Sequence, residues 1–176
     1  MSSQARSSFK ADKRTRLLAI SAMFAALALI FSYVEFLIPL PVPIPGIKLG
    51  LANLVILIAI YRMDFRYAFT INLARILIAG LLFSGVFGML YSLAGGILSI
   101  LVMYGLHKTG LFSMVGVSMA GGVCHNLGQL MTACLLLQNT AILSYFSVLL
   151  FSGLISGILI GILAYMIEKR LPAFTD

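Results

Sequence analysis

Long apolar stretches separated by short polar, glycine-rich or proline-rich breaks dominate the sequence. An apolar run of about 20 residues is long enough to cross the hydrocarbon core of a bilayer as a helix. Six runs are candidates, at residues 17–38, 49–61, 67–83, 89–106, 113–137 and 142–167. The pattern predicts an all-α membrane protein, a six-helix bundle in one membrane domain (17–170), between a basic tail (1–16) and a short tail (171–176).

The second apolar run is unusually short. It has 13 residues, fewer than a helix usually needs to cross the hydrocarbon core. A helix here must begin inside the preceding loop, tilt in the membrane, or enter the bilayer without crossing it.

Composition supports a membrane location. Hydrophobic residues make up 61% of the chain and charged residues 10%, whereas about 25% of a soluble domain is charged. A soluble domain of this length would need more polar side chains to cover its surface. The apolar excess is therefore expected to face lipid.

The positions of the basic residues predict the topology. Five of the 12 Lys and Arg residues precede the first apolar run, and no aromatic residues alternate with them to stack on bases, so a nucleic-acid partner is not expected. Six spans place ten basic residues on one side, Lys48 on the other and Arg75 inside a span. Because basic loops stay in the cytoplasm, we expect both termini to be cytoplasmic.

The loop between the first two runs has the sequence PLPVPIPGIKLG. It includes Pro41, Pro43, Pro45 and Gly46. Proline fixes φ and lacks a backbone donor, so the segment should be stiff and extended. It is either a rigid cap over a ligand site or a simple connection that breaks the helix.

Polar side chains inside a membrane span are costly, so each needs a partner or a function. Arg75 lies in the third run, with Asn72 one turn before it on the same face. Arg75 either bonds to backbone carbonyls or Glu35, or binds an anionic ligand. Glu35 lies near Lys48 in predicted depth, which favours a local ion pair over contact with a ligand.

The fifth run contains a dense polar cluster in GGVCHNLGQL. His125 and Gln129 share a face at i, i+4 spacing, and Asn126 and Gln129 share one at i, i+3. Amide and imidazole groups can hydrogen-bond a buried ligand. They can also join packed helices to one another. Three clustered polar residues slightly favour the ligand hypothesis.

Small residues predict close helix packing. Gly153, Gly157 and Gly161 repeat at four-residue spacing, which lets another backbone approach the helix. Ala22 and Ala26 make a similar step in the first run, and that surface could meet a partner protein.

Several catalytic motifs are missing from the sequence. It has no GxxxxGK[ST], HExxH or GxSxG motif, and no histidine and cysteine spacing typical of a metal site. Diphosphate chemistry with magnesium needs clustered carboxylates, but Asp12, Asp64 and Asp176 are isolated. We therefore expect no enzymatic activity, no cofactor and no metal.

Four ordered segments resemble a known family: PIPGIKLGLAN, LARILIAGLLF, YSLAGGILS and VCHNLGQL. They are similar to the bacterial Gx transporter family, often labelled heptaprenyl diphosphate synthase component I. That family resembles the substrate-binding S components of energy-coupling factor (ECF) importers, which are six-helix membrane proteins. The resemblance implies a bacterial plasma membrane location, a first outer loop closing over a ligand, and a first helix meeting a transmembrane coupling subunit.

The leading hypothesis is a membrane-embedded substrate-binding subunit of a small-molecule importer, driven by separate ATPases. Its ligand is expected to be small and anionic or amphipathic. The candidate contacts are Lys48, Asn72, Arg75, His125, Asn126 and Gln129. The alternative is a non-catalytic membrane accessory subunit in prenyl-diphosphate or quinone metabolism. A channel fits poorly, because the spans lack rows of polar residues.

Overall fold

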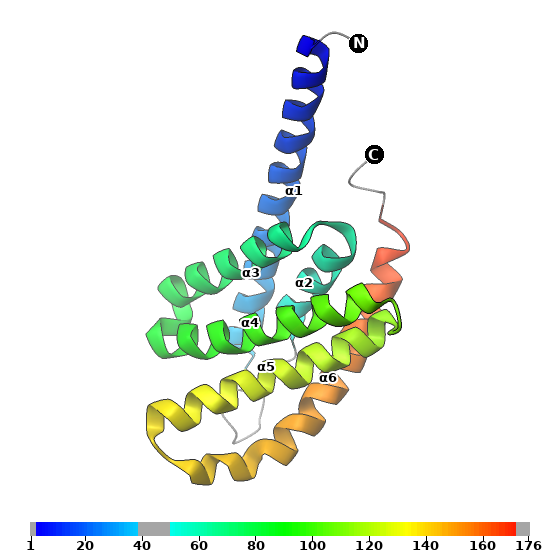
Figure 1. The fold of residues 1–176 in the computed structure, drawn as a ribbon. Coiled ribbons are helices and arrows are strands. Elements are labelled where there is room, and N and C mark those ends of the chain that lie inside the picture. The colour runs from blue at the N-terminus through cyan, green and yellow to red at the C-terminus, as the bar shows by residue number, and fades with distance from the viewer. Residues whose placement is uncertain (1–2, 39–49, 172–176) are drawn as a thin grey trace.

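A computed structural model of the chain describes residues 3–38 and 50–171, with side chains from residue 14 onward (Figure 1). The described elements are α1 (Ser3–Leu37), α2 (Leu51–Arg62), α3 (Phe65–Ala79), the π-helical turn η1 (Gly80–Ser84), α4 (Gly85–Thr109), α5 (Met114–Leu137), the 3₁₀ helix η2 (Thr140–Tyr145) and α6 (Phe146–Glu168). The all-α prediction is confirmed.

Four helical stretches are long and apolar enough to cross a membrane: Arg14–Leu37, Phe65–Thr109, Met114–Leu137 and Thr140–Glu168. Large apolar side chains cover the outside of these stretches, and Leu81, for example, is 83% exposed. In water such a surface would be very unfavourable, whereas lipid solvates it. The chain is therefore a multi-pass membrane protein.

The 45-residue stretch Phe65–Thr109 reverses direction between α3 and α4. The reversal follows η1 and lies at Gly85, whose φ is 68°. This left-handed conformation is readily adopted only by glycine. α3 and α4 then pack side by side (Figure 1).

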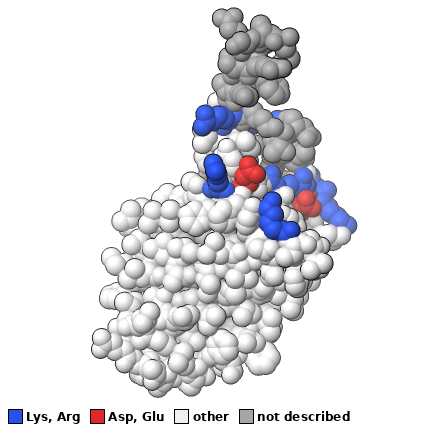
Figure 2. All heavy atoms as spheres, viewed as in Figure 1, with Lys and Arg blue, Asp and Glu red and all other residues white. Residues whose placement is uncertain are grey.

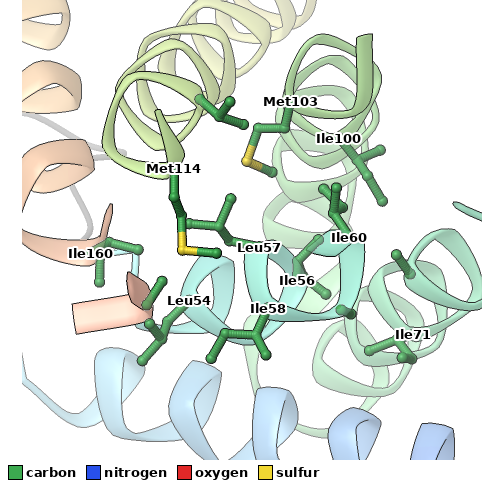
Figure 3. Close-up of a cluster of buried hydrophobic side chains, with 14 of the residues drawn as sticks. Leu54, Ile56, Leu57, Ile58, Ile60, Ile71, Ile100, Met103, Met114 and Ile160 are labelled. Carbon is green, nitrogen blue, oxygen red and sulfur yellow. The ribbon is translucent and has the colours of Figure 1, made fainter. Parts of the chain in front are cut away.

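α2 lies at the centre of the bundle. It has 12 residues, and all its side chains from Leu54 to Ile60 are buried. Leu57 of α2 points toward Met103 of α4 and Met114 of α5 in the core (Figure 3). A helix surrounded by other helices can be hydrophobic all round, which explains the unbroken apolar sequence.

α6 packs very closely against α5 through the predicted glycine repeat. A Cβ atom at Gly153, Gly157 or Gly161 would lie 2.6–2.9 Å from a backbone atom of α5. Only a residue without a Cβ atom permits this separation. The three glycines therefore face a helix of the same chain.

Apart from the buried Arg75, the described basic side chains gather at one end of the molecule, here called the basic end (Figure 2). This end is formed by the carboxyl-terminal ends of α2, α4 and α6 and the amino-terminal ends of α3 and α5. Arg62 Nε lies 2.9 Å from Glu168 Oε1, and the Arg62 guanidinium also donates to the Glu168 and Leu171 carbonyl oxygens. These bonds join α2 to α6. That the basic end faces the cytoplasm stays a prediction.

Two predictions concern the amino-terminal part of the chain: the basic tail and the proline loop. α1 begins at Ser3, so most of the predicted tail (1–16) is helical. The proline loop falls outside the described residues, together with Pro41, Pro43, Pro45, Gly46 and Lys48. The loop as a ligand cap stays a prediction.

Candidate ligand-binding site

A small polar cavity lies among the helices. Its free volume is about 20 Å³, which is enough for about one water molecule. Residues from each of α1 to α6 contribute to its wall. The lining consists of Glu35, Gly50, Ala52, Asn53, Arg75, Ser92, Gly122, His125, Asn126 and Ser156.

The cavity lies near mid-depth in the bundle. Arg75, His125 and Ser156 are ten to twelve residues from the ends of their helices at the basic end. At 1.5 Å per residue this distance is about 15–18 Å, roughly half the thickness of a hydrocarbon core. The polar groups are therefore far from bulk water on the basic side.

Arg75 is the cationic group of the cavity. It is 7% exposed, and its Nε and Nη2 donate to Asn72 Oδ1 at 3.2 and 2.9 Å. Its Nη1 donates to Ser32 Oγ at 3.4 Å. Arginine has five N–H donors, so two remain beyond these bonds within the described part of the chain. Asn72 and Arg75 share a helix face, as their spacing predicted, but hydrogen bonds between the two side chains were not predicted.

Asn72 holds Arg75 in place. Its Oδ1 accepts the two guanidinium bonds, and its Nδ2 donates to the Gly96 carbonyl oxygen of α4 at 3.1 Å. The same side chain thus connects α3 to α4 and fixes the guanidinium beside the cavity. A buried arginine needs such partners, because an ion is costly to place in an apolar interior.

Glu35 connects the two helices that flank the segment at 39–49. Its Oε1 accepts a hydrogen bond from the Leu51 backbone N–H at 2.7 Å. This bond satisfies one of the free N–H groups at the start of α2 and suits a carboxylate there. The predicted ion pair with Lys48 lies outside the described residues and stays a prediction. Elsewhere in the described chain, Arg62 and Glu168 form an ion pair.

The polar cluster of α5 is buried but divides into two parts. His125 and Asn126 line the cavity, whereas Gln129, one turn further along α5, is not part of its wall. Asn126 Nδ2 donates to the Leu149 carbonyl oxygen of α6 at 2.8 Å. Gln129 is 6% exposed, and its Oε1 has no hydrogen-bond partner among the described residues.

The hydrogen bonds show that polar side chains connect helices here. Asn72 bonds across to α4 and Asn126 bonds across to α6. One amide can hold two helices together and still expose its other atoms to a cavity. The two sequence hypotheses for these residues are therefore compatible.

Several cavity residues were not singled out in the sequence. They are Asn53, Ser92 and Ser156, together with Ser32 as a partner of Arg75. The sequence feature that could have identified them is that each is a polar residue within an apolar run. Serine in a helix often bonds to its own backbone, as Ser156 does with the Gly153 carbonyl oxygen, so the signal is weak.

The partner-docking candidates Ala22 and Ala26 do not line the cavity. Ala22 and Ala26 are exposed on α1, near the exposed side chains of Met23 and Leu27. Among the residues that the structure describes, no group of three His, Cys, Asp or Glu side chains is placed to hold a metal ion.

Comparisons with known proteins identify the family. Neither the curated proteins nor the solved structures gave a match. A family model described as heptaprenyl diphosphate synthase component I matches residues 24–167. The match begins within α1, extends into α6 and includes every lining residue of the cavity. The chain therefore belongs to the heptaprenyl diphosphate synthase component I family.

Proposed function

We propose that this chain is the substrate-binding membrane subunit of a small-molecule importer, built as a six-helix transmembrane bundle with both termini in the cytoplasm. The observation that carries the proposal is the convergence of polar groups from α1 to α6 on one buried cavity. In a chain with 61% hydrophobic residues, burying these polar side chains together is unfavourable in free energy unless they bind a ligand.

The cavity chemistry suggests an anionic or amphipathic ligand. Arg75 supplies a positive charge with N–H donors beyond its bonds to Asn72 and Ser32. His125, Asn126 and two serines supply further hydrogen-bonding groups. A carboxylate or phosphate group would be bound by arginine through paired hydrogen bonds.

The described conformation is a closed one in this proposal, because the cavity holds about one water molecule. A ligand would need α1 and α2 to separate at their outer ends. The Glu35 bond to Leu51 joins those ends and would have to break or shift. Residues 39–49 connect them and would close over the ligand.

Transport would require an energy source outside this chain. The sequence has no phosphate-binding loop for ATP, so separate ATPases would act through a transmembrane coupling subunit. The exposed surface of α1 with Ala22 and Ala26 is the proposed contact for that subunit.

A cellular uptake assay tests the proposal once the co-purified ligand has been identified by mass spectrometry. Arg75→Ala and Asn126→Ala are expected to reduce uptake at least tenfold. Arg66→Ala is the matched control, because Arg66 is an exposed arginine on the same helix. Normal uptake by both cavity variants would contradict the proposal.

The family description favours a second function. It names component I of a heptaprenyl diphosphate synthase, which fits a membrane accessory subunit beside a soluble synthase. We propose that such a subunit would be non-catalytic, because the sequence lacks an aspartate-rich motif. Affinity purification of the tagged chain separates the two functions. The importer subunit should recover a coupling subunit with ATPases, and the accessory subunit should recover a prenyl synthase.

A further inference from the structure

The basic end contains a second pocket, larger than the central cavity. Its volume is about 260 Å³, and it lies between α1, the α2–α3 turn and the end of α4. The residues in its wall with polar or charged groups include Tyr61, Arg62, Asp64, Tyr104, His107 and Lys108. The central cavity shares none of these residues.

Aromatic contacts shape this pocket. The rings of Tyr61 and His107 lie 4.1 Å apart between centroids, and those of Phe65 and Tyr104 lie 4.5 Å apart. Tyrosine rings with polar tips are typical of the level where lipid headgroups meet water. Leu17, Ile60 and Met63 are apolar residues in the wall of the same pocket.

The pocket wall carries two basic side chains, Arg62 and Lys108, and one carboxylate, Asp64. Lys108 is exposed, and its Nζ lies 5.4 Å from the centre of the Tyr104 ring. Arg62 is bonded to the Glu168 carboxylate and to two carbonyl oxygens, so its side chain is fixed in position in the wall of the pocket. Asp64 is the opposing carboxylate, and it makes no side-chain capping bond to α3.

We propose that this pocket binds the phosphate group of an amphiphile, with Lys108 as the mobile cation and Leu17, Ile60 and Met63 against the apolar tail. This site rests on the orientation in the proposed function, in which the basic end faces the cytoplasm, where a pocket between helices with basic side chains suits an anionic headgroup. The Tyr61 and Tyr104 hydroxyl groups add donors for phosphate oxygens. The site is independent of the ligand proposed for the central cavity.

Native mass spectrometry of the full chain in detergent tests this site with phosphatidylglycerol as the probe. Lys108→Gln is expected to weaken binding about fivefold, from roughly 1 kcal/mol per basic residue near an anionic headgroup. Asp64→Asn removes the opposing charge and is expected to strengthen binding severalfold. A disturbed fold would not strengthen binding, so this variant separates recognition from misfolding.

Lys169→Gln is the matched control. Lys169 is also exposed at the basic end and lies over a tyrosine ring, at 4.3 Å from the centre of Tyr165, but it does not line the pocket. It should change binding less than twofold. Equal losses for Lys108→Gln and Lys169→Gln would overturn the proposal, as would unchanged binding in Asp64→Asn or no binding to the unaltered chain.

Glycerol 3-phosphate serves as the second probe and distinguishes the source of the phosphate. Binding of phosphatidylglycerol alone, with Lys108 dependence, assigns the site to a lipid headgroup. Lys108-dependent binding of both probes assigns it to phosphate esters in general. Phosphatidylcholine is the neutral comparison, and equal affinity for it would contradict recognition through net negative charge.

Discussion

Gly157→Ala is expected to destabilise the bundle through one methyl group. A Cβ atom at this position would lie 2.6 Å from Met119 Cα, whereas ordinary contacts begin at 3.4 Å. The neighbour is backbone, so a side-chain rotation cannot relieve the clash. α5 and α6 would have to separate along the surface where Gly153 and Gly161 also pack.

The size of this effect follows from two opposing terms. Overpacking a well-packed interior costs about 1–3 kcal/mol. Replacing glycine by alanine in a helix recovers up to about 1 kcal/mol of backbone entropy. Gly105→Ala carries only the second term, because a Cβ atom at Gly105 would have nothing within 4 Å. The two variants should therefore differ by about 1–3 kcal/mol.

Thermal unfolding in detergent measures this difference. At about 2–4 °C per kcal/mol for a chain of this size, Gly157→Ala should unfold several degrees below Gly105→Ala. Equal midpoints for the two variants would refute the close crossing of α5 and α6. A lower midpoint for Gly105→Ala would refute it more strongly.

Substitutions at three further places, Gly85, Asn72 and the Arg62–Glu168 ion pair, test other parts of the structure by the same unfolding assay. Gly85→Ala should lower the free energy of unfolding by about 1 kcal/mol, because φ is 68° at this residue. A Cβ atom there would meet no neighbour, so the backbone conformation alone accounts for the loss, and an unchanged stability would contradict the left-handed turn. Asn72→Leu should cost about 1–3 kcal/mol by removing the acceptor of buried Arg75, with Asn72→Asp recovering part of the loss. A double-mutant cycle tests the Arg62–Glu168 ion pair with Arg62→Met, Glu168→Gln and the variant that carries both changes. Their free energies of unfolding should show a coupling of about 0.5–1 kcal/mol that weakens with salt, because both side chains are partly exposed.

Local spacing predicted that Asn72 and Arg75 share a helix face. Asn72 and Arg75 are three residues apart, and the hydrogen bonds between them follow from that spacing. The short second run became a helix of 12 residues, and burial by its neighbours explains its unbroken apolar sequence. These features depend on helical period and hydrophobicity, which the sequence displays directly.

The convergence of the helices could not be predicted in the same way. Ser92 of α4 and Ser156 of α6 reach the cavity because of the rotation and crossing of their helices, which no local pattern specifies. The same limit applies to Gln129. It was expected to act with His125 because both share a helix face, but the cavity wall on α5 ends one turn earlier. Helical spacing predicts that two side chains point in the same direction from a helix. It does not predict that both lie at the depth of the cavity.

Native mass spectrometry of the gently extracted chain tests most directly whether the cavity around Arg75 binds a ligand. The unaltered chain and Arg66→Met should retain the same bound mass. Arg75→Met should lose it by at least about tenfold, which corresponds to a charged hydrogen bond of about 1.5 kcal/mol or more. Arg75→Lys keeps the charge and should restore part of the binding if Arg75→Met is poorly folded. A folded Arg75→Met protein that retains the full amount of ligand would contradict the assignment of the cavity.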